Sequence, residues 1–155
     1  MLSPESPEYK KILGLKKDIG VELRQVPENA TGTQSESLPG PLFDIFNKEG
    51  DKIGWVALNM RPQNPFDPSQ HKPEDVTILN MDIHFIYEGK YSNQGYGKLI
   101  YAKIQEMLRA QGKKLVSSGV NTDRAIRVWE SLQKRKLATK DPKKGRFDHG
   151  LYKMK

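Results

Sequence analysis

The segment of the chain best suited to chemistry is the glycine-containing stretch Glu88–Leu99, which reads EGKYSNQGYGKL. It follows a stretch rich in β-branched residues and precedes one with apolar residues at helical spacing, so it predicts a turn from a strand into a helix. Glycines in such a turn let backbone N–H groups converge on an anion, and the helix dipole adds to the attraction. The spacing predicts either a phosphate cradle or, more simply, a tight turn that needs two flexible residues.

Two familiar phosphate-binding motifs are excluded at this turn. A Walker loop needs GxxxxGK followed by Ser or Thr, and the chain has no such run. A dinucleotide fingerprint needs a third glycine, but Ile100 stands at that position after Gly95 and Gly97.

The elements that must position this turn are predicted from hydrophobic periodicity. A helix is expected from Ser6–Pro7 to about Lys17, ending before Gly20, with Ser as cap and Pro in the first turn. Two further helices follow the spacing of apolar residues, the first from Gly97 to Gly112 and the second after a cap at Asn121 or Thr122. Strands are predicted at 21–26, 42–46, 52–58, 76–87 and 114–120, and around 137–139 and 147–153.

The alternation along 76–87 divides that strand into two faces. Met81, Ile83, Phe85 and Tyr87 share one face, and Asp82, His84, Ile86 and Glu88 share the other. The polar connection 47–51 predicts a hairpin between the second and third strands. The order of elements predicts a single α/β (α+β) domain over residues 1–155 with at least one parallel crossover, with loop excursions at 27–41 and 61–75.

Two stretches of the chain resemble the GNAT superfamily of N-acyltransferases. Tyr91–Ile100 is similar to the turn that binds acyl-CoA, with Ser92 and Asn93 in place of the family's usual Arg or Gln and Gly. Thr122–Leu132 is similar to a later helix of the family, in which Ala125 matches the family's Ala and Trp129 stands where the family often has the Tyr that acts as general acid. The resemblance covers about residues 42–135. It implies a mixed, mostly antiparallel, twisted sheet with flanking helices, in which the central parallel strands 76–87 and 114–120 splay apart.

The same resemblance implies acetyl-CoA as the acyl donor, an amine as the acceptor, and direct transfer between them without a metal. The pantetheine arm is expected to lie in the splay and the pyrophosphate on the glycine turn. The expected cofactor-binding residues are Phe85, Ile86, Tyr87, Ser92, Asn93, Gln94, Gly95, Tyr96, Gly97, Lys98, Thr122, Ala125 and Trp129. Asp82 and His84 are candidate bases, although each is as readily a solvent-facing strand residue, and Glu88 is a weaker third candidate. Tyr152, Tyr101 or a water is the candidate acid that replaces the missing tyrosine.

The positive charge of the chain is local. The chain has 155 residues and a formal net charge of +7, and the basic C-terminal segment 134–155 carries all of the excess, with nine basic and two acidic residues. Such a segment is most often a solvated surface. It also suits a position beside an acidic or nucleic-acid-associated acceptor, or contact with the cofactor phosphates. The alternative function from another class is a basic nucleic-acid-binding or regulatory module that keeps this fold without catalysis.

Composition removes several other classes of protein. The chain has no cysteine, which excludes disulfides, thiolate metal sites and a cysteine nucleophile. Three scattered histidines do not favour a zinc site, and no apolar run reaches the roughly 20 residues that span a bilayer. The first residues lack the pattern of a secretory signal, so a cytoplasmic protein without membrane contact, monomeric or homodimeric, is expected.

Overall fold

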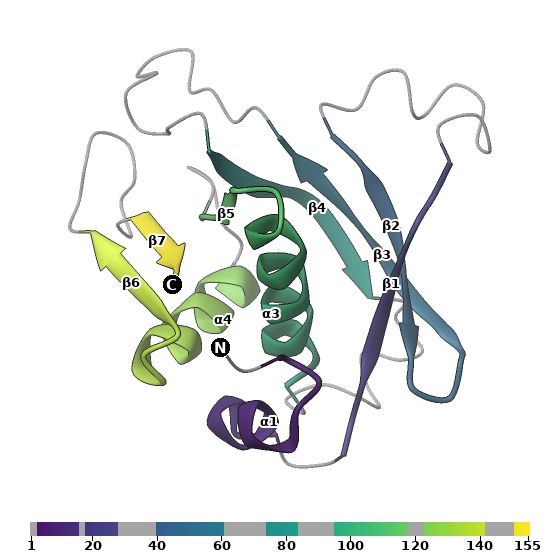
Figure 1. Cartoon of the computed structure of the whole chain (residues 1–155), viewed down its shortest axis with the longest axis horizontal. Helices are drawn as coiled ribbons and strands as arrows, with labels where there is room; N and C mark the ends of the chain where they lie inside the picture. Colours follow the sequence, from purple (N-terminus) through teal and green to yellow (C-terminus); the bar gives the residue numbers. More distant parts are fainter. Residues whose placement is uncertain are drawn as a thin grey trace.

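The computed structural model describes residues 3–15, 18–27, 40–60, 74–83, 95–117, 123–141 and 151–155. Helices α1 (Pro7–Leu13), α3 (Tyr96–Arg109) and α4 (Asp123–Lys134) accompany a five-stranded sheet and a two-stranded sheet within these ranges. Figure 1 shows α3 lying against the large sheet, with α1 at one end of α3 and α4 between α3 and the small sheet. The predicted mixed α/β architecture is confirmed.

Most of the large sheet is antiparallel. Strands β1 (Val21–Gln25), β2 (Leu42–Asn47), β3 (Lys52–Asn59) and β4 (Asp75–Ile83) pair in sequence order. The predicted hairpin joins β2 to β3, and its turn is closed by Gly50, whose φ of 88° suits glycine. Register shifts interrupt the pairing between Ile45 and Phe46 and between Ala57 and Leu58, which is typical of a strongly twisted sheet.

The fifth strand of this sheet is parallel to the fourth. β5 (Lys114–Leu115) follows α3 and pairs with β4 at Asp75 and Val76, so β4, α3 and β5 form the predicted parallel crossover. The small sheet consists of β6 (Ala138–Asp141) and β7 (Leu151–Met154). Among the described residues, a bridge from Val116 to Lys153 connects the two sheets.

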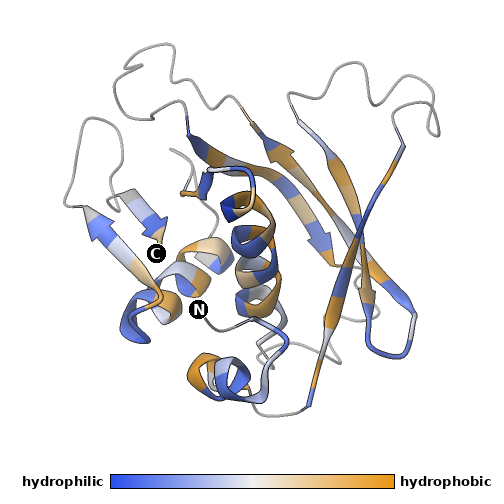
Figure 2. Ribbon diagram, in the orientation of Figure 1, coloured by the Kyte–Doolittle hydropathy of each residue, from blue (hydrophilic) through white to orange (hydrophobic). Residues whose placement is uncertain are grey.

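The core lies between the helices and the large sheet. Ile45, Ile53 and Leu58 of the sheet are fully buried together with apolar residues of α3 and α4. On α4, the apolar residues Ile126, Trp129 and Leu132 are buried, whereas Arg124, Arg127, Glu130 and Lys134 are exposed. Figure 2 shows the resulting mixture of apolar and polar residues along each strand and along α3. The periodicity therefore predicted the buried faces correctly.

The length predicted for the first helix is wrong. α1 ends at Leu13 instead of continuing to about Lys17, because Gly14 adopts a left-handed conformation with φ of 67° and caps the helix. The N–H groups of Gly14 and Leu15 donate to the last carbonyls of α1, those of Lys11 and Lys10. The predicted N-terminus is confirmed, since the Ser6 hydroxyl accepts from the Tyr9 N–H at 3.2 Å.

Several strand boundaries also differ from the prediction, and two of these differences concern β4 and β5. β4 begins at Asp75, so this residue belongs to a strand and not to the excursion predicted over 61–75. β5 contains only Lys114 and Leu115, whereas a strand over 114–120 was predicted; residues 118–120 lie outside the described part of the chain. Within the described ranges, no helix is long and apolar enough to span a membrane.

Candidate functional site

The predicted cradle is described from Gly95 onward. Gly95 has φ of 95° and caps α3, and its carbonyl accepts the first helical hydrogen bond from the Leu99 N–H at 3.0 Å. No side chain caps this end in the described residues, and the first turn of α3 contains no acidic residue. A 14-residue helix that begins this way presents N–H groups and a positive dipole end without a competing carboxylate. The geometry therefore suits an anion.

The two glycines of the turn also have packing roles. A Cβ on Gly95 would meet Leu15 Cδ2 at 2.2 Å, and a Cβ on Gly97 would meet Val128 Cγ2 at 2.9 Å. Gly95 therefore permits both a left-handed backbone and the close approach of the segment after α1, whereas Gly97 permits the close approach of α4. The simpler prediction, a tight turn that needs glycine, accounts for Gly95 in the structure.

Lys98 is held by α1. Its ammonium donates to the Leu13 carbonyl at 2.6 Å, at the C-terminal end of α1, where a cation also complements the helix dipole. Tyr96, the residue between the two glycines, is buried in the core. Among the described cradle residues, the backbone therefore suits an anion, and these two side chains face protein groups.

Strands β4 and β5 separate just where the site is expected. The Val116 N–H donates to the Val76 carbonyl at 2.8 Å. From Thr77 to Ile83, the pairing of β4 in the described residues is with β3 alone. The chain after Val116 turns to β7: the Ser117 N–H donates to the Tyr152 carbonyl at 2.8 Å, and the Ser117 hydroxyl accepts from the Tyr152 N–H at 2.9 Å. Beyond Val76, no strand among the described residues pairs with this edge of β4.

Tyr101, Trp129 and Tyr152 form an aromatic cluster that includes the residue to which Ser117 bonds. The Trp129 ring stacks on Tyr152 at 5.8 Å between centroids and meets Tyr101 edge-on at 5.1 Å. All three side chains are buried, and burial raises the pKa of Tyr101 above its ordinary value. Trp129 therefore packs in the core. Tyr101 keeps its proton, and Tyr152 lies beside the residue at which β5 leaves β4.

Asp82 occupies a different environment from Tyr152. It is exposed on β4, and its partner across the sheet is Trp55, which in turn pairs with Asp44. This row lies on the face opposite Val56 and Met81, as the alternation predicted. Among the described residues, no three His, Asp or Glu side chains are placed to hold a metal ion.

Part of the basic C-terminal segment borders the aromatic cluster. The Lys140 ammonium lies 5.3 Å from the centre of the Tyr152 ring, a cation–π distance. Arg135 instead donates to the Ile12 carbonyl at 3.1 Å and so joins α4 to α1. The segment therefore contains both a cation beside a candidate catalytic residue and one with a structural contact.

Ala125 is half-buried on α4, one helical turn before Trp129. The other predicted site residues lie outside the described residues. These are the candidate base His84 and the predicted cofactor-binding residues Phe85, Ile86, Tyr87, Ser92, Asn93, Gln94 and Thr122. The weaker candidate Glu88 and the alternative cap Asn121 also lie outside them.

Sequence reasoning missed two residues that shape the separation of the strands. Gln105 is buried on α3, and its side-chain oxygen accepts from the Leu115 N–H at 2.8 Å, which fixes β5 to the helix. Ser117 is the second such residue, because its N–H donates to the Tyr152 carbonyl and its hydroxyl accepts from the Tyr152 N–H. A polar residue on the apolar face of a helix is the signal that identifies Gln105; Ser117 has no such signal, because a serine is ordinary at the end of a strand.

No family model matches the chain, and no curated protein matches it. Among solved structures, the chain is similar to an IAA acetyltransferase from Bacillus cereus ATCC 14579, with 16% sequence identity, 79% of each chain covered and a TM-score of 0.49.

Proposed function

We propose that this protein is a GNAT-type N-acetyltransferase that uses acetyl-CoA. The observation that carries the proposal is the separation of β4 from β5 beyond Val76 and Val116, on the same strand–turn–helix unit that contains Gly95. An extended pantetheine arm has amide groups that suit an unpaired strand edge, and a pyrophosphate suits the start of α3. The resemblance of Tyr91–Ile100 to an acyl-CoA turn supports the same assignment.

The proposed reaction is a direct acyl transfer. A neutral amine nitrogen attacks the thioester carbonyl, the C–N bond forms, and the C–S bond breaks. The amine loses one proton and the CoA thiolate gains one, so the reaction needs a proton acceptor and a proton donor but no oxidant. A donor to the carbonyl oxygen stabilises the tetrahedral intermediate.

Within the described residues, Asp82 is the proposed acceptor of the amine proton and Tyr152 is the proposed donor to the thiolate. Asp82 is exposed on the strand that would bind the pantetheine arm. Tyr152 is joined to Ser117, the residue directly after the last β4–β5 hydrogen bond, so its backbone is fixed beside the gap. The cation of Lys140 next to its ring favours an acceptor molecule with negative charge, such as an acidic peptide or a nucleic-acid-associated amine.

Calorimetry with acetyl-CoA tests the first half of this proposal. We expect saturable binding with one site per chain, and no comparable binding of ATP, which has phosphates and adenine but lacks the pantetheine arm. Release of free CoA thiol in the presence of a panel of primary amines tests the second half. No acetyl-CoA binding at millimolar concentration overturns the proposal.

A variant tests the role of the candidate acid. Tyr152→Phe keeps the stacking on Trp129 but removes the hydroxyl. We expect kcat to fall by about 10²-fold with little change in the acetyl-CoA Kd. An unaltered kcat assigns the proton donor to another group.

A further inference from the structure

The C-terminal end of α1 is closed partly by side chains of other helices. The last four carbonyls of a helix have no partner within the helix itself. In α1, two of these carbonyls accept from the backbone N–H groups that follow the helix. The other two accept from cations: the Ile12 carbonyl from Arg135 at 3.1 Å, and the Leu13 carbonyl from Lys98 at 2.6 Å. The end of α4 and the start of α3 therefore each supply one cation to the same end of α1.

Lys98 lies where a cation is unfavourable for its own helix. It is in the first turn of α3, and a helix N-terminus is the positive end of the helix dipole. The C-terminal end of α1 is negative, so the bond to the Leu13 carbonyl offsets that repulsion. Leu15, just after α1, packs so closely on Gly95 that a Cβ there would clash with it. The end of α1 therefore contacts both the cap and the first turn of α3.

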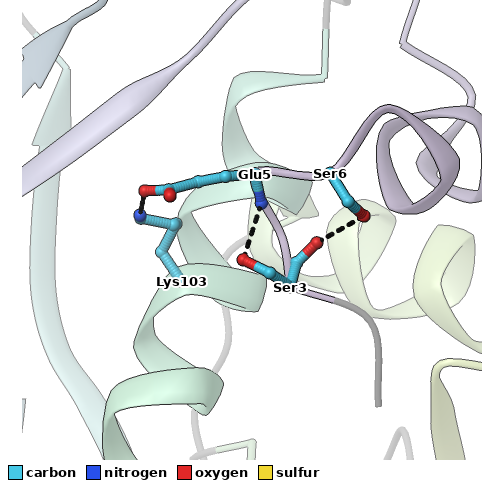
Figure 3. Close-up of polar contacts among 4 residues, drawn as sticks. All are labelled: Ser3, Glu5, Ser6 and Lys103. Atoms are coloured by element: carbon cyan, nitrogen blue, oxygen red, sulfur yellow. Dashed lines mark hydrogen bonds and ion pairs between the residues drawn. The ribbon is translucent and has the colours of Figure 1, made fainter.

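The other end of α1 is attached to the middle of α3. Figure 3 shows the Glu5 carboxylate meeting the Lys103 ammonium, whose side chain is only 14% exposed. The Ser3 hydroxyl accepts from the Glu5 N–H, and the Ser6 hydroxyl donates to the Ser3 carbonyl, which closes the turn before α1. α1 is thus held along α3 at two separate places.

α1 depends on these contacts because it is short. It has 7 residues, whereas an isolated helix needs roughly 12–15 residues to be even marginally stable in water. Leu13 is fully buried in the core, so the helix forms as it docks on the rest of the chain. A short terminal element of this kind is typical of units that open locally while the sheet stays folded.

We propose that docked α1 holds the start of α3 in its anion-binding form, and that Arg135 and Glu5 act through α1 as positioning residues for the cofactor. When α1 detaches, Lys98 loses its carbonyl partner and Gly95 loses the contact with Leu15, so the first turn of α3 frays. Because such coupling is reciprocal, a bound cofactor also stabilises docked α1. The inference rests on the proposed function for the identity of the anion, acetyl-CoA, whereas the link between α1 and α3 needs no ligand.

Hydrogen exchange of the ¹⁵N-labelled, ligand-free chain tests the link itself. Arg135→Gln removes the donor to the Ile12 carbonyl and so loosens α1. We expect at least about threefold faster exchange at the Gly14 amide and also at the Leu99 amide, which makes the first hydrogen bond of α3. Lys134→Gln, the same change of charge at the neighbouring exposed residue, should leave both rates unchanged. An unchanged Leu99 rate in Arg135→Gln, whether or not the Gly14 rate rises, overturns the proposal.

Saturating acetyl-CoA provides the reciprocal test. We expect it to slow exchange at the Gly14 amide of the wild-type chain at least about threefold, because undocking of α1 then also weakens the bound cofactor. A helix with a structural role alone would open without releasing the cofactor, so an unchanged Gly14 rate in the saturated protein overturns the proposal. If acetyl-CoA does not bind, the proposed function fails, and the Leu99 response to Arg135→Gln still decides whether α1 holds α3.

A double substitution without a change in net charge isolates the positioning role. Glu5→Gln with Arg135→Gln removes one negative and one positive charge, and both residues contact α3 or α1 instead of the proposed cofactor site. Because the apparent Kd rises as the docked fraction falls, we expect an acetyl-CoA Kd about threefold higher. Arg135→Lys in place of Arg135→Gln keeps a cation for the Ile12 carbonyl and should recover most of the loss.

The matched control makes the same two charge changes at exposed residues. Glu49→Gln with Lys134→Gln should leave the acetyl-CoA Kd at the wild-type value. Equal Kd values in the two double variants contradict the positioning role of Glu5 and Arg135.

Discussion

Ser117 and Tyr152 exchange two hydrogen bonds, one through the Ser117 backbone and one through its hydroxyl, at 2.8 and 2.9 Å. Because Ser117 directly follows Val116, whose N–H donates to the Val76 carbonyl of β4, these two bonds direct the Ser117 backbone to β7. The proposed cofactor site therefore depends on a contact between the two sheets.

Ser117→Ala tests the importance of this contact for stability. The substitution leaves the buried Tyr152 N–H without its acceptor, so we expect the free energy of unfolding to fall by about 1–3 kcal/mol. Chemical denaturation measures the change. Gln133→Ala, an exposed change on α4, is the control and should cost less than about 0.5 kcal/mol. Equal effects of the two substitutions contradict a structural role for the serine hydroxyl.

Gly97→Ala tests the packing of α3 on α4. Alanine is the better helix former by about 1 kcal/mol, so an open position would gain stability. Here the new Cβ would meet Val128 Cγ2 at 2.9 Å, and we expect a net loss of about 1 kcal/mol in thermal or chemical denaturation.

The control for Gly97→Ala is the same change in a Val128→Ala background. Removal of the Val128 methyl groups opens the space, so Gly97→Ala should be neutral or stabilising there. An identical loss in both backgrounds would show that the close approach of Val128 is not the reason for glycine at this position.

The raised pKa of Tyr101 predicts that the folded chain loses stability in alkaline solution. Its pKa is raised by burial, so in the folded chain it stays protonated while the unfolded chain releases the proton near pH 10. The stabilising effect is therefore complete below pH 10 and is lost as the pH rises above it. Between pH 9 and 11, unfolding measurements should show wild type losing about 1 kcal/mol more than Tyr101→Phe. Parallel pH curves for the two proteins exclude a raised pKa.

Beyond Arg135, the basic segment should not contribute to cofactor binding. Lys136, Lys140 and Lys155 are exposed, and the elements that form the proposed acetyl-CoA site lie before this segment, except for Tyr152. We expect Lys136→Gln, Lys140→Gln and Lys155→Gln together to change the acetyl-CoA Kd by less than about twofold in calorimetry while raising the KM of an acidic acceptor. A tenfold weaker cofactor Kd would instead indicate that these cations contact the cofactor phosphates.

The sequence allowed much of this fold to be predicted because the relevant signals are local. Alternation located β1, β2 and β3, and helical spacing located α3 and the buried stripe of α4. The end of α1 was mispredicted because Gly14 terminates the helix through its backbone conformation, and the apolar pattern does not report that conformation.

The arrangement around the candidate site was harder to predict because it depends on long-range contacts. The contacts of Gly97 with Val128 and of Lys98 with Leu13 join residues far apart in the sequence, and each gives a cradle residue a packing role. Such features become visible only when the folded chain brings the segments together.

We propose that acetyl-CoA lies along the edge of β4 beyond Val76 and on the start of α3. A titration of the ¹⁵N-labelled protein with acetyl-CoA, followed residue by residue, tests this placement most directly. We expect saturable shifts of the Gly95, Tyr96 and Gly97 amides and of β4 between Ile78 and Ile83, with the amides of the β2–β3 turn unchanged. Saturable binding that leaves Gly95–Gly97 and β4 unmoved, or no binding at all, would contradict it.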